Sequence, residues 1–337
     1  MIVSTDTKDA LSRVLYPVLL GSPIAVWAWL WRGIGWDPGV ALQLVYWSNL
    51  AVLMVLERLL PFERAWMKDD GQIKNDLCFS AMSVAVNSLA TVACLWLIVW
   101  LIKLLEPVLS FDVWPIRWPF FAQVILGVLL WDLGNHLAHR WAHKVGFLWR
   151  FHAVHHAAPR LSVINTGRLH PLDVVKSVAI GAPIPVLLGV PAEVSLWYAA
   201  FNVFTGMLTH ANLDLECGVF NRFLSTPNLH RWHHSPHQRE TDTNFGEATV
   251  IWDRLFGSYF NPERPPRRNV GLGAEVRVSR KLLEAIFQPL TPRGHHASDA
   301  NLIAQLAAGE AGTDADDEGS SGTAPIRDPG LSRAKAR

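Results

Sequence analysis

Four stretches without a charged residue constrain this chain more than any other feature of its sequence. They cover residues 14–31, 39–56, 77–102 and 118–131. A helix needs about 20 apolar residues to cross the hydrocarbon core of a bilayer, and the first three windows reach or nearly reach that length. Pro17 and Pro23 interrupt the first window and predict a kink or a late start there. The sequence therefore predicts an all-α integral membrane protein with about four transmembrane helices.

The fourth window has only 14 residues, and its helix is expected to continue past Asp132 into water. The residues that support this extension recur at steps of four, three and four: Asp132, His136, His139 and His143. Such steps stay on one face of an α-helix for three turns. Two later windows, 177–192 and 194–213, are split by Pro191 and Glu193 and predict a helical hairpin. Their length leaves open whether the hairpin crosses the bilayer or only dips into it.

The composition agrees with a membrane protein and argues against a nucleic-acid partner. Charged residues make up only 18% of the chain, whereas soluble domains carry about 25%. The 16 Trp suit membrane–water interfaces. A net charge of +1 does not provide the basic face that nucleic acid requires, so we expect no such partner.

The chain divides into three segments by composition. Residues 1–38 hold an N-terminal segment and the first membrane helix, and residues 39–290 form the membrane-embedded domain. Residues 291–337 are expected to be a disordered tail, because this stretch has too few apolar residues to form a core.

Lysine and arginine near the spans predict the orientation. Residues 139–176 carry six of them and residues 61–75 carry three, whereas 106–117 and 32–38 carry one each. Cytoplasmic loops are the ones enriched in these residues. With alternating spans, this places the N-terminus, the 61–75 loop and a helical cap that carries the histidine clusters on the cytoplasmic side.

Three histidine clusters are the main chemical signal. They are His139-x-x-x-His143, His152-x-x-His155-His156 and His230-x-x-His233-His234. With 14 His in 337 residues, a random chain would hold about 0.02 copies of H-x-x-H-H if residues were independent draws. Spacings of three and four bring side chains to one helical face, and imidazole is a common metal ligand. Because eight imidazoles exceed the needs of one ion, the clusters predict two metal ions.

Other polar residues near the clusters are secondary candidates. His210 ends an apolar window and is expected to be a further ligand. The residues expected beside the metals, or as possible ligands, are Asp132, His136, His170, Asn212 and Asp214. Asp132 either holds an imidazole N–H or marks a helix boundary, and Asp214 ligates, orients His210 or caps the span. His136 is expected next to the metals or facing substrate, and His170 is either a structural hydrogen-bonding residue or a ligand.

At these clusters the chain resembles the fatty acid hydroxylase / sterol desaturase superfamily of membrane oxygenases, whose members share three histidine boxes in this order. The boxes here read HRWAH, HAVHH and HRWHH. Further similar segments are Arg168–Asp173, Asp242–Gly246 and Trp252–Gly257, and the resemblance covers roughly residues 40–262. His136 is a departure, because members of the family often carry an aromatic residue there.

The resemblance implies a multi-pass protein with a cytosolic di-iron site over the bilayer, in a bacterial inner membrane or an ER-type membrane. Two Fe²⁺ ions would use O2 and external electrons on a lipid substrate. The donor would be a separate cytochrome b5-, ferredoxin- or reductase-type protein, since the chain has no His-Pro-Gly-Gly haem motif and no flavin, nicotinamide or iron–sulfur motif.

Hydroxylation of a lipid C–H bond is the first functional prediction, and desaturation of an acyl or sterol-like lipid is the second. A histidine-rich metal-binding membrane protein or transporter is the alternative from another class. Transporters usually place polar ligands near the bilayer midplane, whereas these clusters lie at and beyond the ends of the predicted spans.

Overall fold

Every regular element in the described part of the chain is helical, and four helices are long and apolar enough to cross a membrane. The structure is a computed structural model that describes residues 5–105, 113–266, 268–273 and 277–291. The four candidate spans are formed by α1 (Thr5–Ala28) with the π-helical turn η1 (Trp29–Gly33), α2 (Pro38–Leu59), α3 (Ile73–Leu105) and α4 (Phe120–Lys144). The prediction of an all-α, multi-pass membrane protein is confirmed. Apart from Thr291, the predicted tail lies outside the described residues.

The predicted late start of the first helix is wrong, because α1 begins at Thr5. Pro17 and Pro23 lie inside α1 without ending it, although proline removes a backbone hydrogen bond in a helix interior. Buried Tyr16 and Trp27 anchor this helix in an apolar core that also includes Phe204 of α8. Tertiary packing therefore keeps the helix continuous as far as the π-helical turn.

The predicted hairpin is formed by α6 (Pro171–Gly181), α7 (Pro183–Leu187) and α8 (Ala192–His210). Its first arm is broken before Pro183 into helices of 11 and five residues, each too short to cross a bilayer. Neither arm is among the candidate spans found in the described residues. By contrast, α4 continues through Asp132 to Lys144, as predicted.

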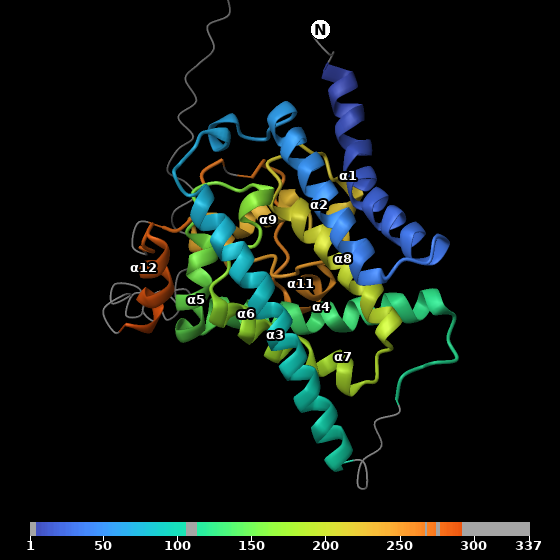
Figure 1. Ribbon diagram of the computed structural model, residues 1–337. Helices are drawn as coiled ribbons and strands as arrows, with labels where there is room; N and C mark the ends of the chain where they lie inside the picture. The colour runs from blue at the N-terminus through green and yellow to red at the C-terminus, as the bar shows by residue number, and fades with distance from the viewer. Residues whose placement is uncertain (1–4, 106–112, 267, 274–276, 292–337) are drawn as a thin grey trace, which may run out of the picture. The chain divides into compact units, whose positions relative to one another are not determined.

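Short helices form a cap at one end of the long ones. They are η2 (Arg64–Met67), α5 (Gly146–His156), η3 (Val163–Asn165), η4 (Gly218–Arg222), α9 (Pro227–His233), α10 (Gln238–Thr241), α11 (Ile251–Phe256), α12 (Leu282–Phe287) and η5 (Gln288–Leu290). Helix α4 packs against α5, α6 and α8, and α8 packs against α9 (Figure 1). The cap therefore rests on the C-terminal half of α4 and the end of α8.

Two glycines let α4 and α6 approach closely. A Cβ atom on Gly134 would lie 2.4 Å from the carbonyl oxygen of Gly181, which is shorter than any real contact of that kind. Only glycine at this crossing lets the histidine-bearing half of α4 pack directly on α6.

Polar contacts bind the loop after α2 to the cap. The buried carboxylate of Glu57 accepts hydrogen bonds from the backbone N–H groups of Val163 and Asn212. The Phe62 N–H donates to the Asn212 carbonyl oxygen, and Arg13 pairs with Glu216. The start of the first span, the 61–75 loop and the cap thus lie at the same end of the spans, as the predicted topology requires.

Candidate metal centre

Nine buried histidines gather into two groups in the described residues, and they are the nine that the sequence nominates as ligands. One group holds His139, His143, His152, His156 and His233, and the other holds His155, His210, His230 and His234. Within each group the ligand nitrogens lie within 4.8 Å of one another. No ring is more than 7% exposed.

Each H-x-x-H-H box is divided between the two groups. His155 and His156 are neighbours in α5 but belong to different groups, and so do His233 and His234 at the end of α9. Successive residues of a helix point about 100° apart, which sends neighbouring rings to different groups. One short helix therefore serves both groups.

In the five-histidine group, oxygen atoms hold the Nδ1 side of four rings. The pairs are His139 with the Phe245 carbonyl at 2.8 Å, His233 with the Thr243 carbonyl at 2.8 Å, His152 with Asp173 at 2.9 Å and His143 with Asp242 at 3.3 Å. A carbonyl or an ionised carboxylate can only accept, so Nδ1 carries the proton and Nε2 keeps its lone pair. Metal-binding histidines have this same arrangement.

The Nε2 atoms of this group converge without protein partners that would satisfy them. Those of His143, His156 and His233 are buried and have no hydrogen-bond partner, and those of His139 and His152 lie 3.1 Å apart. An unpaired buried nitrogen costs free energy, whereas a cation at the point of convergence would satisfy all of them. The residues therefore fit a metal ion.

The four-histidine group has similar geometry. The Nε2 atom of His230 lies 2.9 Å from that of His210 and 3.1 Å from that of His234. Nitrogens at right angles around an ion, with bonds of about 2.1 Å, would be ~3.0 Å apart. These spacings fit a second ion.

Burial keeps the imidazoles of the cap neutral. It lowers the pKa of His152 to about 4, although the Asp173 carboxylate opposes the shift, and it lowers the pKa of His155 to about 3. Burial alone would raise the pKa of Asp173, but His152 and Lys176 outweigh it and the pKa falls. Neutral imidazole is the form that binds metal.

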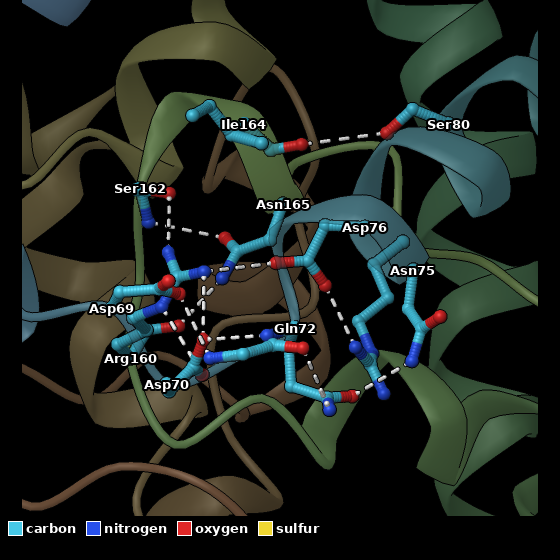
Figure 2. A network of polar contacts seen from close by, with 12 residues as sticks. Asp69, Asp70, Gln72, Asn75, Asp76, Ser80, Arg160, Ser162, Ile164 and Asn165 are labelled. Carbon is cyan, nitrogen blue, oxygen red and sulfur yellow. Dashed lines mark hydrogen bonds and ion pairs between the residues drawn. The ribbon is translucent and has the colours of Figure 1, made fainter. Parts of the chain in front are cut away.

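A buried ionic network supports the partners of the four-histidine group (Figure 2). Arg160 pairs with Asp70 and with Asp76 of α3, and Arg168 pairs with Asp76 at 2.7 Å. The Arg168 carbonyl oxygen accepts from His155 Nδ1 at 3.3 Å. A chain of contacts therefore runs from a membrane-spanning helix to a candidate ligand.

Asn165 contacts the ring of His210, another candidate ligand of the four-histidine group. Its side-chain oxygen lies 3.4 Å from His210 Nδ1 and accepts from the Ser162 N–H, while its amide donates to the Arg160 carbonyl oxygen. Figure 2 shows Asn165 beside Arg160 and Ser162. The loop before α6 thus orients ligands of the second group.

The structure gives Asp132 a role other than the two that the sequence suggested. It holds no imidazole; its carboxylate accepts from the Ala248 and Thr249 N–H groups and from the Thr249 hydroxyl. Asp132 also lies in the middle of α4 rather than at a helix boundary. It fastens the 248–249 segment to α4.

His136 is completely buried but belongs to neither group. Its ring lies against Phe245 and Phe256, and Nδ1 is 3.7 Å from an oxygen of Asp253. It lines neither a histidine group nor the cavity described below. The packing is that of a core aromatic residue.

The remaining secondary candidates, His170, Asn212 and Asp214, lie outside both histidine groups. His170 caps α6: Nδ1 accepts from the Leu172 N–H, and Nε2 donates to the Ile286 carbonyl oxygen. The side chain of Asn212 bonds the Glu63 backbone, and Asp214 is exposed. None of the three belongs to a histidine group.

Sequence reasoning missed Asp173 and Asp242 as partners of ligand rings. Asp173 lies 21 residues from His152 and Asp242 lies 99 from His143, so no local spacing connects them. The only signal was the location of both in segments that resemble the family.

A cavity of about 150 Å³ adjoins both groups. His139 and His152 of the first group line it, as do His155, His210 and His230 of the second. Lys176, Asn202 and Glu247 also reach it. A small molecule there would contact both groups at once.

The fold and the two histidine groups define a multi-pass membrane protein of the histidine-box class. Residues 124–258 match the family model described as fatty acid hydroxylase, and the chain belongs to this family. It is 37% identical to the ornithine lipid hydroxylase OlsE of Rhizobium tropici over 86% of this chain and 87% of that protein. The sequence-based identification of the family is confirmed.

More distant relatives are the alkylglycerol monooxygenases of Danio rerio and Homo sapiens. They are 31% and 27% identical over 44% and 43% of this chain, and the match spans 32% of each of those proteins. No solved structure matches the chain.

Proposed function

We propose that this protein is an O2-dependent di-iron monooxygenase that hydroxylates a C–H bond of a membrane lipid. The observation that carries the proposal is the pair of buried all-histidine groups beside one shared cavity. The names of the relatives support it, since they state hydroxylation of an ornithine lipid and monooxygenation of alkylglycerols. Ornithine lipid is therefore the first substrate to test.

The nine histidines would hold two Fe²⁺ ions, one in each group. Iron there supplies oxygen activation: with two electrons and two protons from outside the chain, one atom of O2 enters the C–H bond as a hydroxyl group and the other leaves as water. Asp173, Asp242 and Asn165 keep the rings oriented. Burial of the groups excludes bulk water from the centre.

Two alternatives remain as outcomes of the test. A lipid desaturase would use the same histidines, and the words hydroxylase and monooxygenase in the relatives' names favour hydroxylation over it. A metal transporter would be expected to carry ligands near the middle of its spans. In the described residues, α1, α2 and α3 contribute no ligand to either group, which argues against transport.

The electron donor and the orientation belong to the same proposal. We place the centre on the cytoplasmic face, because the segments richest in Lys and Arg lie at its end of the spans. A cytochrome b5-, ferredoxin- or reductase-type protein would deliver the electrons there.

The test uses full-length protein in lipid nanodiscs. Wild-type protein is expected to contain two iron ions per chain and, with a reducing system, to add one oxygen atom to a lipid in an O2-dependent reaction. His139→Ala and His155→Ala, one from each group, should lose iron and activity. His237→Ala, at an exposed histidine outside both groups, should retain both. Zinc in place of iron, or no oxygenated product from any lipid extract, would refute the proposal, and loss of two hydrogens would indicate a desaturase.

A further inference from the structure

The rings of the four-histidine group have fewer partners than those of the five-histidine group. In the described residues, Nδ1 of His230 and Nδ1 of His234 are buried and have no hydrogen-bond partner. Nδ1 of His155 and Nδ1 of His210 each contact a neutral oxygen, at 3.3 and 3.4 Å. Two rings of the five-histidine group, by contrast, contact carboxylates. The orientation of the four-histidine group therefore depends on two neutral contacts and on the residues that hold their acceptors in place.

Arg168 provides the acceptor for His155. Its backbone carbonyl oxygen accepts from His155 Nδ1, while its side-chain Nε donates to the Val154 carbonyl oxygen at 3.1 Å. The buried guanidinium also donates to the carboxylate of Asp76 at 2.7 Å. Because a charge-assisted bond of this kind is short and strong, Asp76 fixes where Arg168 lies against α5.

Asn165, the acceptor for His210, depends on the same carboxylate. The Asn165 amide donates to the Arg160 carbonyl oxygen at 2.7 Å, and the Arg160 side chain donates to the other oxygen of Asp76 at 3.1 Å (Figure 2). Arg160 also pairs with Asp70, whose side chain is 18% exposed, against 2% for Asp76. Asp76 is thus the buried carboxylate that the two arginines share.

Asp76 belongs to a polar stripe on a candidate membrane span. Ser80 and Ser83 follow it in α3 at steps of four and three, so the three residues share one helical face. The Ser80 hydroxyl donates to the Ile164 carbonyl oxygen, and the Ser83 hydroxyl donates to the Gly167 carbonyl oxygen. The stripe therefore connects α3 to the loop that presents both acceptors.

We infer that Asp76 positions the four-histidine group and selectively sets its affinity for a metal ion. This inference rests on the metal-binding part of the proposed function. Asp76 belongs to neither histidine group, so it is a positioning residue that acts through Arg168 and Arg160. Asparagine in its place would keep one acceptor oxygen and turn an amide NH2, which cannot accept, toward one of the two arginines.

The test measures the affinity of full-length protein in nanodiscs for Fe²⁺, without O2, by competition with a chelator. It uses two backgrounds that each disable one group. His143→Ala with His233→Ala leaves the four-histidine group, and His210→Ala with His234→Ala leaves the five-histidine group. Asp76→Asn is expected to lower affinity about tenfold or more in the first background and less than about threefold in the second. A merely structural role would lower both alike.

Two further variants keep the test decisive. Glu63→Gln weakens an ion pair with Arg268 and is the matched control, expected to leave both affinities unchanged. Arg168→Lys replaces Asp76→Asn if that variant does not fold. Lysine keeps a positive charge facing Asp76 but lacks the Nε that donates to the Val154 carbonyl oxygen, so it should weaken the same group.

Equal losses in the two backgrounds, or wild-type affinity in Asp76→Asn, would overturn the inference, as would an equal loss in Glu63→Gln. In the otherwise unchanged chain, mass spectrometry of the intact protein should find fewer ions in Asp76→Asn than in wild type at the same chelator concentration, and an unchanged number would overturn it as well. A protein that binds both ions but oxygenates no lipid would refute the proposed function and leave this inference standing. A protein that binds no metal would refute both.

Discussion

Replacing Asp173 by Asn tests whether the histidines act as metal ligands. Asp173 accepts from His152 Nδ1 at 2.9 Å, and its side chain is 3% exposed. Asparagine keeps the shape and one acceptor oxygen but removes the charge that strengthens the bond. Loss of such a partner lowers metal affinity by about 10- to 100-fold, which corresponds to about 1.4–2.7 kcal/mol.

Asp242 provides a graded comparison within the same group. It lies 3.3 Å from His143 Nδ1, is 12% exposed, and also pairs with exposed Lys144. A longer contact that is more exposed to solvent contributes less to metal affinity. Asp242→Asn is therefore expected to reduce metal affinity by less than about tenfold. The prediction that Asp173→Asn loses more metal affinity than Asp242→Asn follows from the burial and the length of the two contacts alone.

Competition with a chelator of known affinity measures both variants, and mass spectrometry of the intact protein gives the number of ions retained. Thermal unfolding of the metal-free proteins is measured in parallel, because Asp173→Asn also leaves Lys176 without its partner and is expected to destabilise the fold. Wild-type metal affinity in Asp173→Asn, or a larger loss in Asp242→Asn, would refute the assignment of His152 as a ligand held by Asp173.

Three further predictions concern other parts of the structure. His136→Phe should retain both metal ions and the melting temperature to within a few degrees, since the ring packs among aromatics outside both groups; metal loss would contradict this. Gly134→Ala should destabilise the protein by about 1–3 kcal/mol, because its Cβ meets the Gly181 carbonyl oxygen, and wild-type stability would show that the crossing can relax. For metal-free protein, the free energy of unfolding should fall as pH drops from about 6.5 toward 4. The unfolded chain binds protons there that buried His152 and His155 do not, since their pKa values are lowered to about 4 and about 3. Chemical denaturation across that range measures the slope, and a flat profile would contradict it.

The spans and the histidines were predictable because local patterns determine them. A charge-free run predicts a span by its length alone, and the stripe from Asp132 to His143 predicts the extension of α4 because helical geometry fixes which side chains share a face. The expectation that each H-x-x-H-H box presents its rings on one face was wrong: each box is divided between the two groups, because neighbouring residues of a helix point in different directions.

The contacts that orient the histidines were not predictable, because they join segments distant in sequence. Asp132 shares a helical face with His139, yet it binds the backbone of Ala248, 116 residues away. Asp76 reaches Arg168 across 92 residues. A carboxylate on the right face can serve any donor that the fold brings near, and spacing alone does not identify which one.

The division of each H-x-x-H-H box between two groups affects how the proposed centre fills. Because α5 and α9 each serve both groups, an ion bound in one immobilises the helices that present nitrogens to the other. The affinities of the two ions are then coupled, and the coupling is reciprocal, typically about 1–3 kcal/mol. When iron is scarce, the two groups would therefore not fill independently of each other.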